Sequence, residues 1–205
     1  MAARGRILAL SAPSGGGKST LAQAVIARTP NVARAITCTT RPRRPGEEEG
    51  HDYYFLSPEE FERRRQAGEF LEWAEVFGHY YGTHRSYWER ARRENRDLVL
   101  DIDVQGARQL RREIPEAVSI FILAPSRDIL EQRLRARSED PGEVIERRLR
   151  EAREEIRNFR EYDYVLVNRD LDTAVADLAS IIRAERLRRA RMEEEILPIL
   201  ASFDG

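Results

Sequence analysis

A glycine-rich loop that carries the only lysine of the chain is the first segment whose residues could do chemistry. A strand-like run at 6–10 is followed by Ser11-Ala12-Pro13-Ser14-Gly15-Gly16-Gly17-Lys18-Ser19-Thr20 and then by a helical pattern. Glycines let many backbone N–H groups converge on one phosphate, and the N-terminus of the next helix adds partial positive charge. In such loops the lysine reaches the outer phosphates of a nucleotide, and the following hydroxyl binds Mg²⁺. We therefore predict a nucleotide-phosphate site, formed by Ser14, Gly15, Gly16, Gly17, Lys18, Ser19 and Thr20.

The lysine distinguishes this loop from an ordinary glycine-rich turn. Lys18 is the only lysine, so arginine provides 34 of the 35 basic side chains. A compact ammonium can bridge two phosphates, whereas a planar guanidinium would require the loop to move. The loop departs from G-x-x-x-x-G-K-[ST] only at Ala12, which replaces the first glycine and is tolerated if its φ angle is negative.

Two carboxylates end a second strand-like run. Residues 97–103 are apolar between Asp97 and the pair Asp101 and Asp103. In parallel α/β sheets the ligand crevice lies beyond the carboxyl ends of the strands. A carboxylate there can hold Mg²⁺ directly or through water. Alone this is a common way for a strand to end, but beside the glycine loop it predicts a metal site at Ser19 and Asp101.

Composition and charge restrict the class of protein. The chain has 205 residues, of which 41% are hydrophobic and 35% charged, as in one globular domain of moderate size or a core with small insertions. A net charge of -1 gives no excess that would attract nucleic acid. No apolar run approaches the roughly 20 residues of a membrane span, and no secretory signal is visible. With Cys38 as its only cysteine, we expect a cytoplasmic protein without disulfides, in which Cys38 is a small buried apolar side chain.

Alternating strands and helices predict the fold. Further strand-like runs lie at 118–123 and 164–167, and helical patterns lie at 104–113, 126–136, 143–160 and 171–191. This alternation indicates an α/β P-loop three-layer fold with a central parallel sheet and helices on both faces. The arginine-rich end of the last helix and the glutamates after it read as a solvated face, with a partner surface as the alternative.

Residues 35–90 break this alternation. They contain clustered Gly, Pro, Tyr and His, with short strand-like pieces at 53–55, 70–73 and 80–81. An inserted subdomain of mixed α+β character is the simplest explanation. We therefore expect a core of residues 1–34 and 91–205, an insert of residues 35–90, and a mobile connection at 137–142 between two helices.

Basic and phenolic side chains of the insert suit a second phosphate. Arg41 and Arg44 flank a proline in a stiffened loop, and the hydroxyls of Tyr53 and Tyr81 can add neutral donors. A phosphate monoester is therefore a plausible acceptor. Because arginine is so abundant in this chain, Arg41 and Arg44 alone favour the simpler interpretation, solvated arginines.

A carboxylate in an apolar strand-like run suggests what else the insert recognises. Glu72 lies between Leu71 and Trp73 and needs a partner if it is buried. Guanine offers two adjacent donors, N1–H and N2–H₂, that one carboxylate can accept together, whereas adenine offers no such pair. Hydroxyls of Thr37 and Thr83 can serve the remaining polar edge. The competing interpretation places Glu72 on an edge strand, pointing outward.

Together these segments resemble the bacterial-type guanylate kinases, which are nucleoside monophosphate kinases of the P-loop family. The resemblance covers nearly the whole chain, with matching stretches at 11–20, 39–47, 50–55, 68–76, 80–83, 100–107 and 165–168. So many matches in order are far more specific than a glycine loop alone. They imply the P-loop fold with a GMP-binding insert and a short helical lid at about 133–150.

The resemblance also implies the substrate-binding residues. The phosphate of GMP is expected at Arg41, Arg44, Tyr53 and Tyr81. Guanine is expected at Thr37, Glu72 and Thr83, although serine is commoner than threonine at position 37. Asp101 and Asp103 are expected near GMP and Mg²⁺, and Asn168 near the adenine of ATP. The expected catalytic residues are Lys18 and the lid arginines Arg133, Arg137 and Arg148.

The implied reaction is Mg²⁺-dependent transfer of the γ-phosphoryl group of ATP to GMP or dGMP, giving ADP and GDP. The expected partners are the small molecules ATP and GMP, with no nucleic acid and no membrane, and the oligomeric state is left open. A phosphate oxygen is already a nucleophile, so no histidine needs to act as a base.

Two alternatives stay open. A related P-loop kinase could act on another phosphate, such as a ribose bisphosphate, but it would not need Glu72 and the threonine hydroxyls. A guanylate-kinase-like module could bind protein ligands without catalysis, but it could dispense with Lys18, the glycine loop and the lid arginines.

Overall fold

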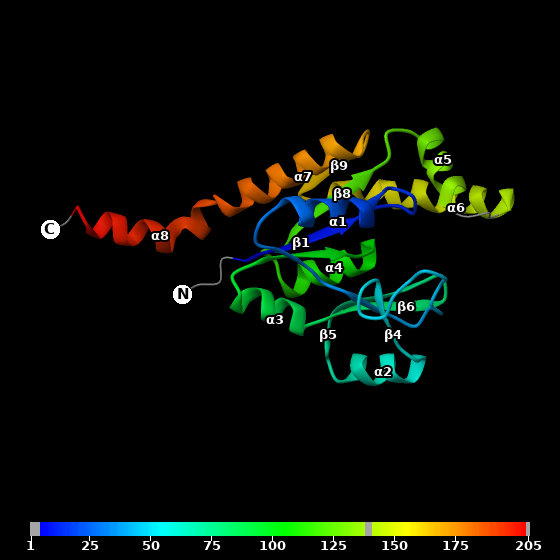
Figure 1. Cartoon of the computed structure of the whole chain (residues 1–205), viewed down its shortest axis with the longest axis horizontal. Coiled ribbons are helices and arrows are strands. Elements are labelled where there is room, and N and C mark those ends of the chain that lie inside the picture. Colours follow the sequence, from blue (N-terminus) through cyan, green and yellow to red (C-terminus); the bar gives the residue numbers. More distant parts are fainter. Residues whose placement is uncertain (1–4, 138–140, 204–205) are drawn as a thin grey trace.

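A five-stranded parallel sheet lies at the centre of the computed structural model, which describes residues 5–137 and 141–203 (Figure 1). The strand order is β2-β7-β1-β8-β9, and every neighbouring pair is parallel. The strands are β1 (Ile7–Ser11), β2 (Val32–Arg34), β7 (Asp97–Asp101), β8 (Val118–Leu123) and β9 (Tyr164–Val167). This sheet is the predicted α/β core.

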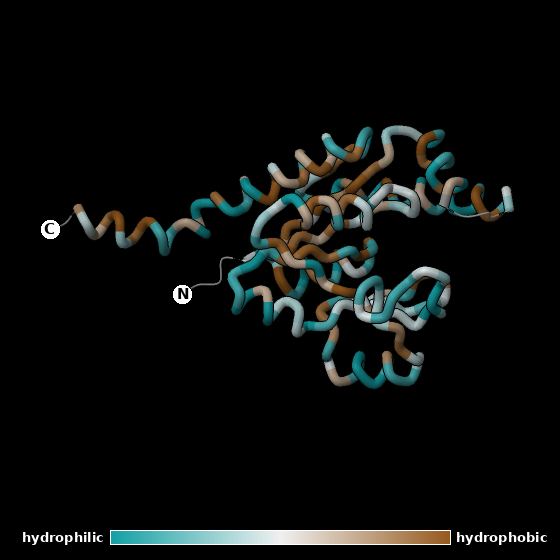
Figure 2. The backbone as a smooth tube through the Cα atoms, in the orientation of Figure 1, coloured by the Kyte–Doolittle hydropathy of each residue, from teal (hydrophilic) through white to brown (hydrophobic). Residues whose placement is uncertain are grey.

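Helices cover both faces of this sheet. The helices α1 (Lys18–Arg28) and α7 (Leu171–Arg186) pack against the face that carries Leu8 and Leu10 of β1. On the other face, α3 (Ser86–Arg93) and α4 (Val104–Glu113) pack against Ile7 and Ala9. Alternate residues of one strand thus pack into two hydrophobic cores. This explains why these strands are continuously apolar and do not alternate between polar and apolar residues. Figure 2 shows this hydrophobic centre in brown.

A second sheet of four strands packs beside the core. It has the order β4-β3-β6-β5, with one parallel pair and two antiparallel pairs. Its strands are β3 (Thr37–Thr39), β4 (Tyr53–Phe55), β5 (Phe70–Val76) and β6 (His79–His84). The helix α2 (Pro58–Gln66) covers one face through Phe61, whose ring stacks on Phe70 at 4.5 Å beside buried Cys38. Figure 1 shows this unit below the core, and it is the mixed insert expected from the sequence.

A pair of helices projects at the end of the molecule opposite the two termini (Figure 1). These are α5 (Arg127–Arg137) and α6 (Gly142–Ile156), followed by a 3₁₀ turn, η1 (Arg157–Glu161). They share a small core of their own, made by Leu130, Leu134, Ile145, Leu149 and Ala152.

Several predicted boundaries were wrong. The helical pattern at 171–191 is not one helix: α7 ends at Arg186, and α8 (Arg189–Ala201) starts after a break and extends away from the body (Figure 1). The pattern at 143–160 turns into the 3₁₀ segment after Ile156. The strand at 97–103 ends at Asp101, and Asp103 instead caps α4. The connection predicted at 137–142 includes residues 138–140, which lie outside the described residues.

A buried carboxylate fixes the break between α7 and α8. Asp97, at the start of β7, is 4% exposed and accepts a hydrogen bond from the backbone N–H of Arg6 at 2.8 Å. Its other contacts are the guanidinium of Arg186 at 2.7 Å and that of Arg191 at 3.4 Å. Because Arg186 and Arg191 flank the break, both helices turn their basic ends toward one carboxylate.

We expect Asp97→Ala to lower the free energy of unfolding by about 3–5 kcal/mol, because it leaves the buried guanidinium of Arg191 without its partner. The control is Asp172→Ala, which removes an ion pair of similar length, 2.7 Å to Arg28, at an exposed position. That change should cost less than about 1 kcal/mol. Urea unfolding of the two variants measures both values, and equal losses would contradict the role given to Asp97.

Candidate active site

The glycine loop turns from β1 into α1 in the conformation that its glycines allow. Gly15 and Gly17 have φ angles of 85° and 89°, in the left-handed region where only glycine is unstrained. The N–H of Gly16 donates to the carbonyl of Pro13 at 2.9 Å and closes the turn. In the described ranges, non-glycine residues with positive φ are Asn31, Phe77 and Asn95, so Ala12 has the negative φ that the sequence analysis required.

One carboxylate joins the two predicted parts of the phosphate site. Asp101 lies on β7 beside Leu10 of β1, so it ends next to the start of the loop. One of its oxygens lies 2.8 Å from Nζ of Lys18, and the other accepts a hydrogen bond from Oγ of Ser19 at 2.6 Å. Lys18 also donates to the carbonyl of Ile102 at 2.8 Å. The structure therefore brings Lys18, Ser19 and Asp101 together.

Electrostatics keep this cluster charged. Burial disfavours the ammonium of Lys18, but the neighbouring Asp101 outweighs burial and raises the pKa of Lys18 above its usual value. Burial likewise opposes the Asp101 carboxylate, yet the charge of Lys18 and the hydroxyl of Ser19 lower its pKa. Both groups are thus ionised. Lys18 can exchange Asp101 for a phosphate, and Asp101 can exchange Lys18 for a cation.

Asp103 has a different surrounding from Asp101. Its carboxylate accepts the N–H of Gly106 at 2.8 Å and caps α4, while its carbonyl faces the hydroxyl of Ser11 at 3.4 Å. Asp101, by contrast, faces the glycine loop. The two carboxylates lie two residues apart in the sequence, but in the structure they therefore have different surroundings and different hydrogen-bond partners.

Glu72 is buried, so the expectation of an outward edge position is wrong. The strand β5 is indeed at the edge of its sheet, but Glu72 is only 4% exposed and pairs across the sheet with Thr83. A register shift between Phe70 and Glu72 turns the side chain toward the core. Oε1 of Glu72 and Oγ1 of Thr83 are both buried without a hydrogen-bond partner in the described part of the chain. Such atoms call for a polar ligand.

Burial also changes the titration of Glu72. Burial raises its pKa to about 7, helped by the charge of Asp103 and opposed by Thr83 and Lys18. A partner that donates hydrogen bonds to the charged form would reverse this shift.

Two residues of α4 that sequence reasoning missed hold Glu72 in place. A Cβ atom at Gly106 would lie 2.3 Å from Oε2 of Glu72, so only glycine leaves room for the carboxylate. Gln109 pairs with the backbone of Trp73, accepting its N–H at 3.2 Å and donating to its carbonyl at 2.6 Å. A glycine inside a helical pattern was the available signal for Gly106. No local signal marked Gln109.

Three of the four predicted phosphate ligands of the insert lie together. The guanidinium of Arg41 is 5.3 Å from the ring centre of Tyr53, and the rings of Tyr53 and Tyr81 are 6.2 Å apart. Thr37 pairs with Tyr53 and so lies on this face of the sheet. The side chain of Arg41 is held by Glu47 at 2.6 Å, whereas Arg44 contributes its backbone N–H to Glu47 and exposes its side chain.

The lid arginines differ in how far they reach the loop. Nη2 of Arg133 donates to the carbonyl of Asn168 at 2.9 Å, and the Asn168 amide donates to the carbonyl of Gly16 at 3.2 Å. Nη1 of Arg133 is buried without a partner in the described residues. Arg148 is half-buried on α6, and the side chain of Arg137 lies outside the described residues.

Comparison with known proteins identifies the family of this chain. The profile of the guanylate kinase family matches residues 4–185. A guanylate kinase of Symbiobacterium thermophilum is 51% identical over 92% of this chain and 89% of its own length. One of Vibrio parahaemolyticus is 50% identical over 92% of each chain. The crystal structure of guanylate kinase from Anaplasma phagocytophilum superposes with a TM-score of 0.76 at 38% identity, covering 91% of this chain and 89% of that one.

The chain belongs to the guanylate kinase family. The reaction is therefore ATP:GMP phosphotransfer, and both alternatives raised by the sequence are set aside. None of the described helices has the length and apolar character needed to cross a bilayer.

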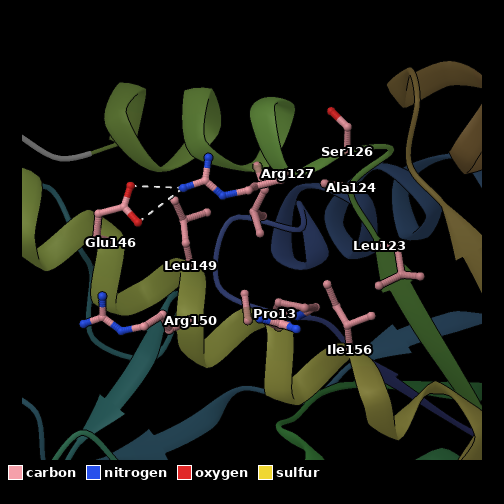
Figure 3. Close-up of a pocket in the computed structure, with 12 residues that line it drawn as sticks. Pro13, Leu123, Ala124, Ser126, Arg127, Glu146, Leu149, Arg150 and Ile156 are labelled. Atoms are coloured by element: carbon pink, nitrogen blue, oxygen red, sulfur yellow. Dashed lines mark hydrogen bonds and ion pairs between the residues drawn. The ribbon is translucent and has the colours of Figure 1, made fainter.

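A cavity of about 590 Å³ lies between the projecting helices α5 and α6, beside the end of β8 and the glycine loop (Figure 3). Its floor is largely apolar, with Leu149 and Ile156 of α6 and Pro13 of the glycine loop. Arg127 of α5 reaches across to Glu146 of α6 at 3.0 Å, as the dashed lines in Figure 3 show. None of the residues predicted to bind ATP lines this cavity. A movement of α5 and α6 relative to the core sheet would change the shape of this cavity.

We expect stability to report the titration of Glu72. The folded protein holds a proton on Glu72 up to about pH 7, whereas the unfolded chain releases it near pH 4.5. The Glu72 contribution therefore makes the free energy of unfolding fall as the pH rises between these values, by about 3 kcal/mol in total.

Urea unfolding of the nucleotide-free protein and of Glu72→Gln from pH 4.5 to 8 measures this contribution. The glutamine variant should gain relative stability up to about pH 7, with a constant difference above it. Glu155, whose pKa burial also raises to about 7, is present in both proteins and cancels. A difference independent of pH would contradict a carboxyl that titrates in the folded state.

Proposed function

We propose that the insert reads GMP while the glycine loop holds ATP, with the residues that the sequence predicted. The observation that carries this proposal is the buried edge formed by Glu72 and Thr83, where Oε1 of Glu72 and Oγ1 of Thr83 form no hydrogen bond of normal geometry in the described residues. The two adjacent donors of guanine would satisfy the Glu72 carboxylate and favour its charged form. Thr37 and Thr83 would serve the rest of the base.

The phosphate of GMP would bind at Arg41, Arg44, Tyr53 and Tyr81. Arg41 is already desolvated against Tyr53 and held by Glu47, so a phosphate would need only to share or replace that carboxylate. Arg44 would turn its exposed side chain inward. Asp103, which caps α4 next to Glu72, would face the same nucleotide.

ATP would place its phosphates on the N–H groups of Ser14, Gly15, Gly16, Gly17, Lys18, Ser19 and Thr20. Its base would lie by Asn168, which is tied to Gly16 and Arg133. We assign the core to residues 1–34 and 91–205 and the insert to residues 35–90. The lid comprises residues of about 133–150, whose arginines Arg133, Arg137 and Arg148 would gather around the transferring phosphoryl group.

The residues at the loop fit a magnesium ion that arrives with ATP. Ser19 and Asp101 present adjacent oxygen atoms, the ligands that Mg²⁺ prefers. The described residues contain no group of three or more His, Cys, Asp or Glu side chains able to hold a metal. Phosphate oxygens and water would complete the coordination. When bound, the ion would neutralise phosphate charge.

The protein's own task is positioning and charge stabilisation. A nucleotide phosphate would draw Lys18 away from Asp101 and Ile102. The ammonium would then lie beside the phosphate oxygens on which negative charge develops during the transfer. Glu72 and the insert would align the GMP phosphate with the γ-phosphoryl group, which leaves no need for a general base. Closure of insert and lid would exclude water.

A coupled ADP-release assay with ATP and Mg²⁺ tests the proposal against GMP, dGMP, AMP, CMP and UMP. We expect activity with the two guanine nucleotides, because only guanine presents the donor pair that Glu72 accepts. Comparable activity with AMP would contradict the assignment of Glu72, Thr37 and Thr83.

We expect Lys18→Ala to lower kcat by about 10²–10³-fold, because its contacts strengthen as charge moves to the leaving group. The KM for GMP should change by less than about threefold, since Lys18 is on the ATP side of the site. Steady-state kinetics with both substrates varied measures the two effects. A variant with normal kcat and a raised KM for GMP would refute this role.

We expect Glu72→Gln to lower kcat/KM for GMP by about 100-fold and to narrow the preference for GMP over AMP, because an amide cannot accept both guanine donors. The matched control is Glu75→Gln, an exposed glutamate of the same strand. It should leave both substrates unaffected. Equal behaviour of the two variants in the ADP-release assay would overturn the assignment.

A further inference from the structure

A second cavity lies where the insert joins the core. Its volume is about 690 Å³, within the range of small-molecule sites. Its wall contains four arginines and two tyrosines: Arg34, Arg64, Arg90, Arg93, Tyr54 and Tyr87. None of the residues assigned to ATP or GMP lines it.

The cavity is on the far side of the insert sheet from the proposed GMP site. Cys38 and Tyr54 pair across β3 and β4, one residue after the pair Thr37 and Tyr53. Successive side chains of a strand point to opposite faces, so Cys38 and Tyr54 face away from the GMP side. Both line the cavity, and Thr37 and Tyr53 do not.

The wall carries positive charge without carboxylates. The chain has 36 acidic residues, yet none of them lines the cavity. Arg34, Arg90 and Arg93 form no ion pair within the described part of the chain, whereas Arg64 is paired with Glu60 of its own helix at 2.6 Å. Three guanidiniums of this concave surface therefore have no carboxylate as a counter-charge among the described residues.

One of these arginines has an unmet hydrogen-bonding need. Nε of Arg34 is buried and has no hydrogen-bond partner in the described residues. Asp52 and Asp101 are close enough for the charge of Arg34 to act on them, but neither forms an ion pair with it. A buried guanidinium N–H without a partner is costly unless a ligand supplies an acceptor.

The tyrosines give the cavity shape and neutral donors. The guanidinium of Arg90 lies 5.4 Å from the ring centre of Tyr87, which orients Arg90 on the wall. The Tyr87 hydroxyl is close to that of Tyr54, and burial and this neighbour raise the pKa of Tyr87. The Tyr87 phenol therefore stays protonated at neutral pH and can donate to an anion.

We propose that this cavity binds an oligophosphate, a chain of two or three phosphates that is free or part of a nucleotide. Planar guanidiniums match phosphate oxygens, and several of them around one concave wall suit a multiply charged anion better than a single phosphate. Arg34 and Arg93 belong to the core and Tyr54 and Arg64 to the insert, so the ligand would tie the two together. This site is additional to the proposed function and does not depend on it.

Calorimetric titration of the nucleotide-free chain with inorganic triphosphate tests the site. We expect two binding sites, the glycine loop and this cavity. Lys18→Ala should remove the first, and Arg90→Gln combined with Arg93→Gln should weaken the second at least about tenfold. The control Arg92→Gln removes one positive charge from the same helix, at a guanidinium that covers Trp88 outside the cavity. It should alter neither site by more than about twofold.

The source of the phosphates is distinguished in the Lys18→Ala background by titrating ATP beside inorganic triphosphate. Equal affinities at the site sensitive to Arg90 and Arg93 mean that the cavity reads only phosphate, and tighter ATP means that it takes nucleotides. A single site in the unmodified chain that Lys18→Ala abolishes would overturn the proposal. So would an equal loss in Arg92→Gln and in the double variant, since it would indicate diffuse charge. Phosphotransfer is measured separately, so failure here does not bear on the active site.

Discussion

The contact of Asp101 with Lys18 and Ser19 is the constraint on which the rest of the site depends. It joins the end of β7 to the start of α1, two elements that neighbouring strands bring together. The carboxylate keeps a buried ammonium charged while no phosphate is present, so the loop does not collapse around an unpaired lysine. The glycine loop, where we propose that ATP binds, is thus organised by one acidic side chain of the core sheet.

The proposed GMP site is organised by the core as well, although most of its residues belong to the insert. Glu72 is buried only because α4 offers it a glycine, and β5 is held at that helix by the side chain of Gln109. The insert is therefore attached to the core at the residue that we propose reads the base.

The sequence predicts elements whose signal is local. The strands β1, β7 and β8 are apolar runs buried on both faces, β9 is an apolar run at the sheet edge, and the glycine loop contains its own chemistry. The short polar strand β3, with its Thr-Cys-Thr sequence, gives no such signal. The break after Arg186 was missed because no glycine or proline marks it, and its cause is Asp97, about ninety residues earlier. Likewise the inward turn of Glu72 depends on Gly106 and Gln109, which no pattern around position 72 reveals.

Because the chain has a single lysine, reagents that modify amines have only one side-chain target. An acylating or reductive-alkylating reagent finds one side-chain amine, and that amine sits at the centre of the phosphate loop. Such reagents attack only the neutral amine, which Asp101 keeps scarce by holding the proton on Lys18. This one side chain is therefore expected to react slowly even when the loop is empty, and the 34 arginines offer such reagents no amine.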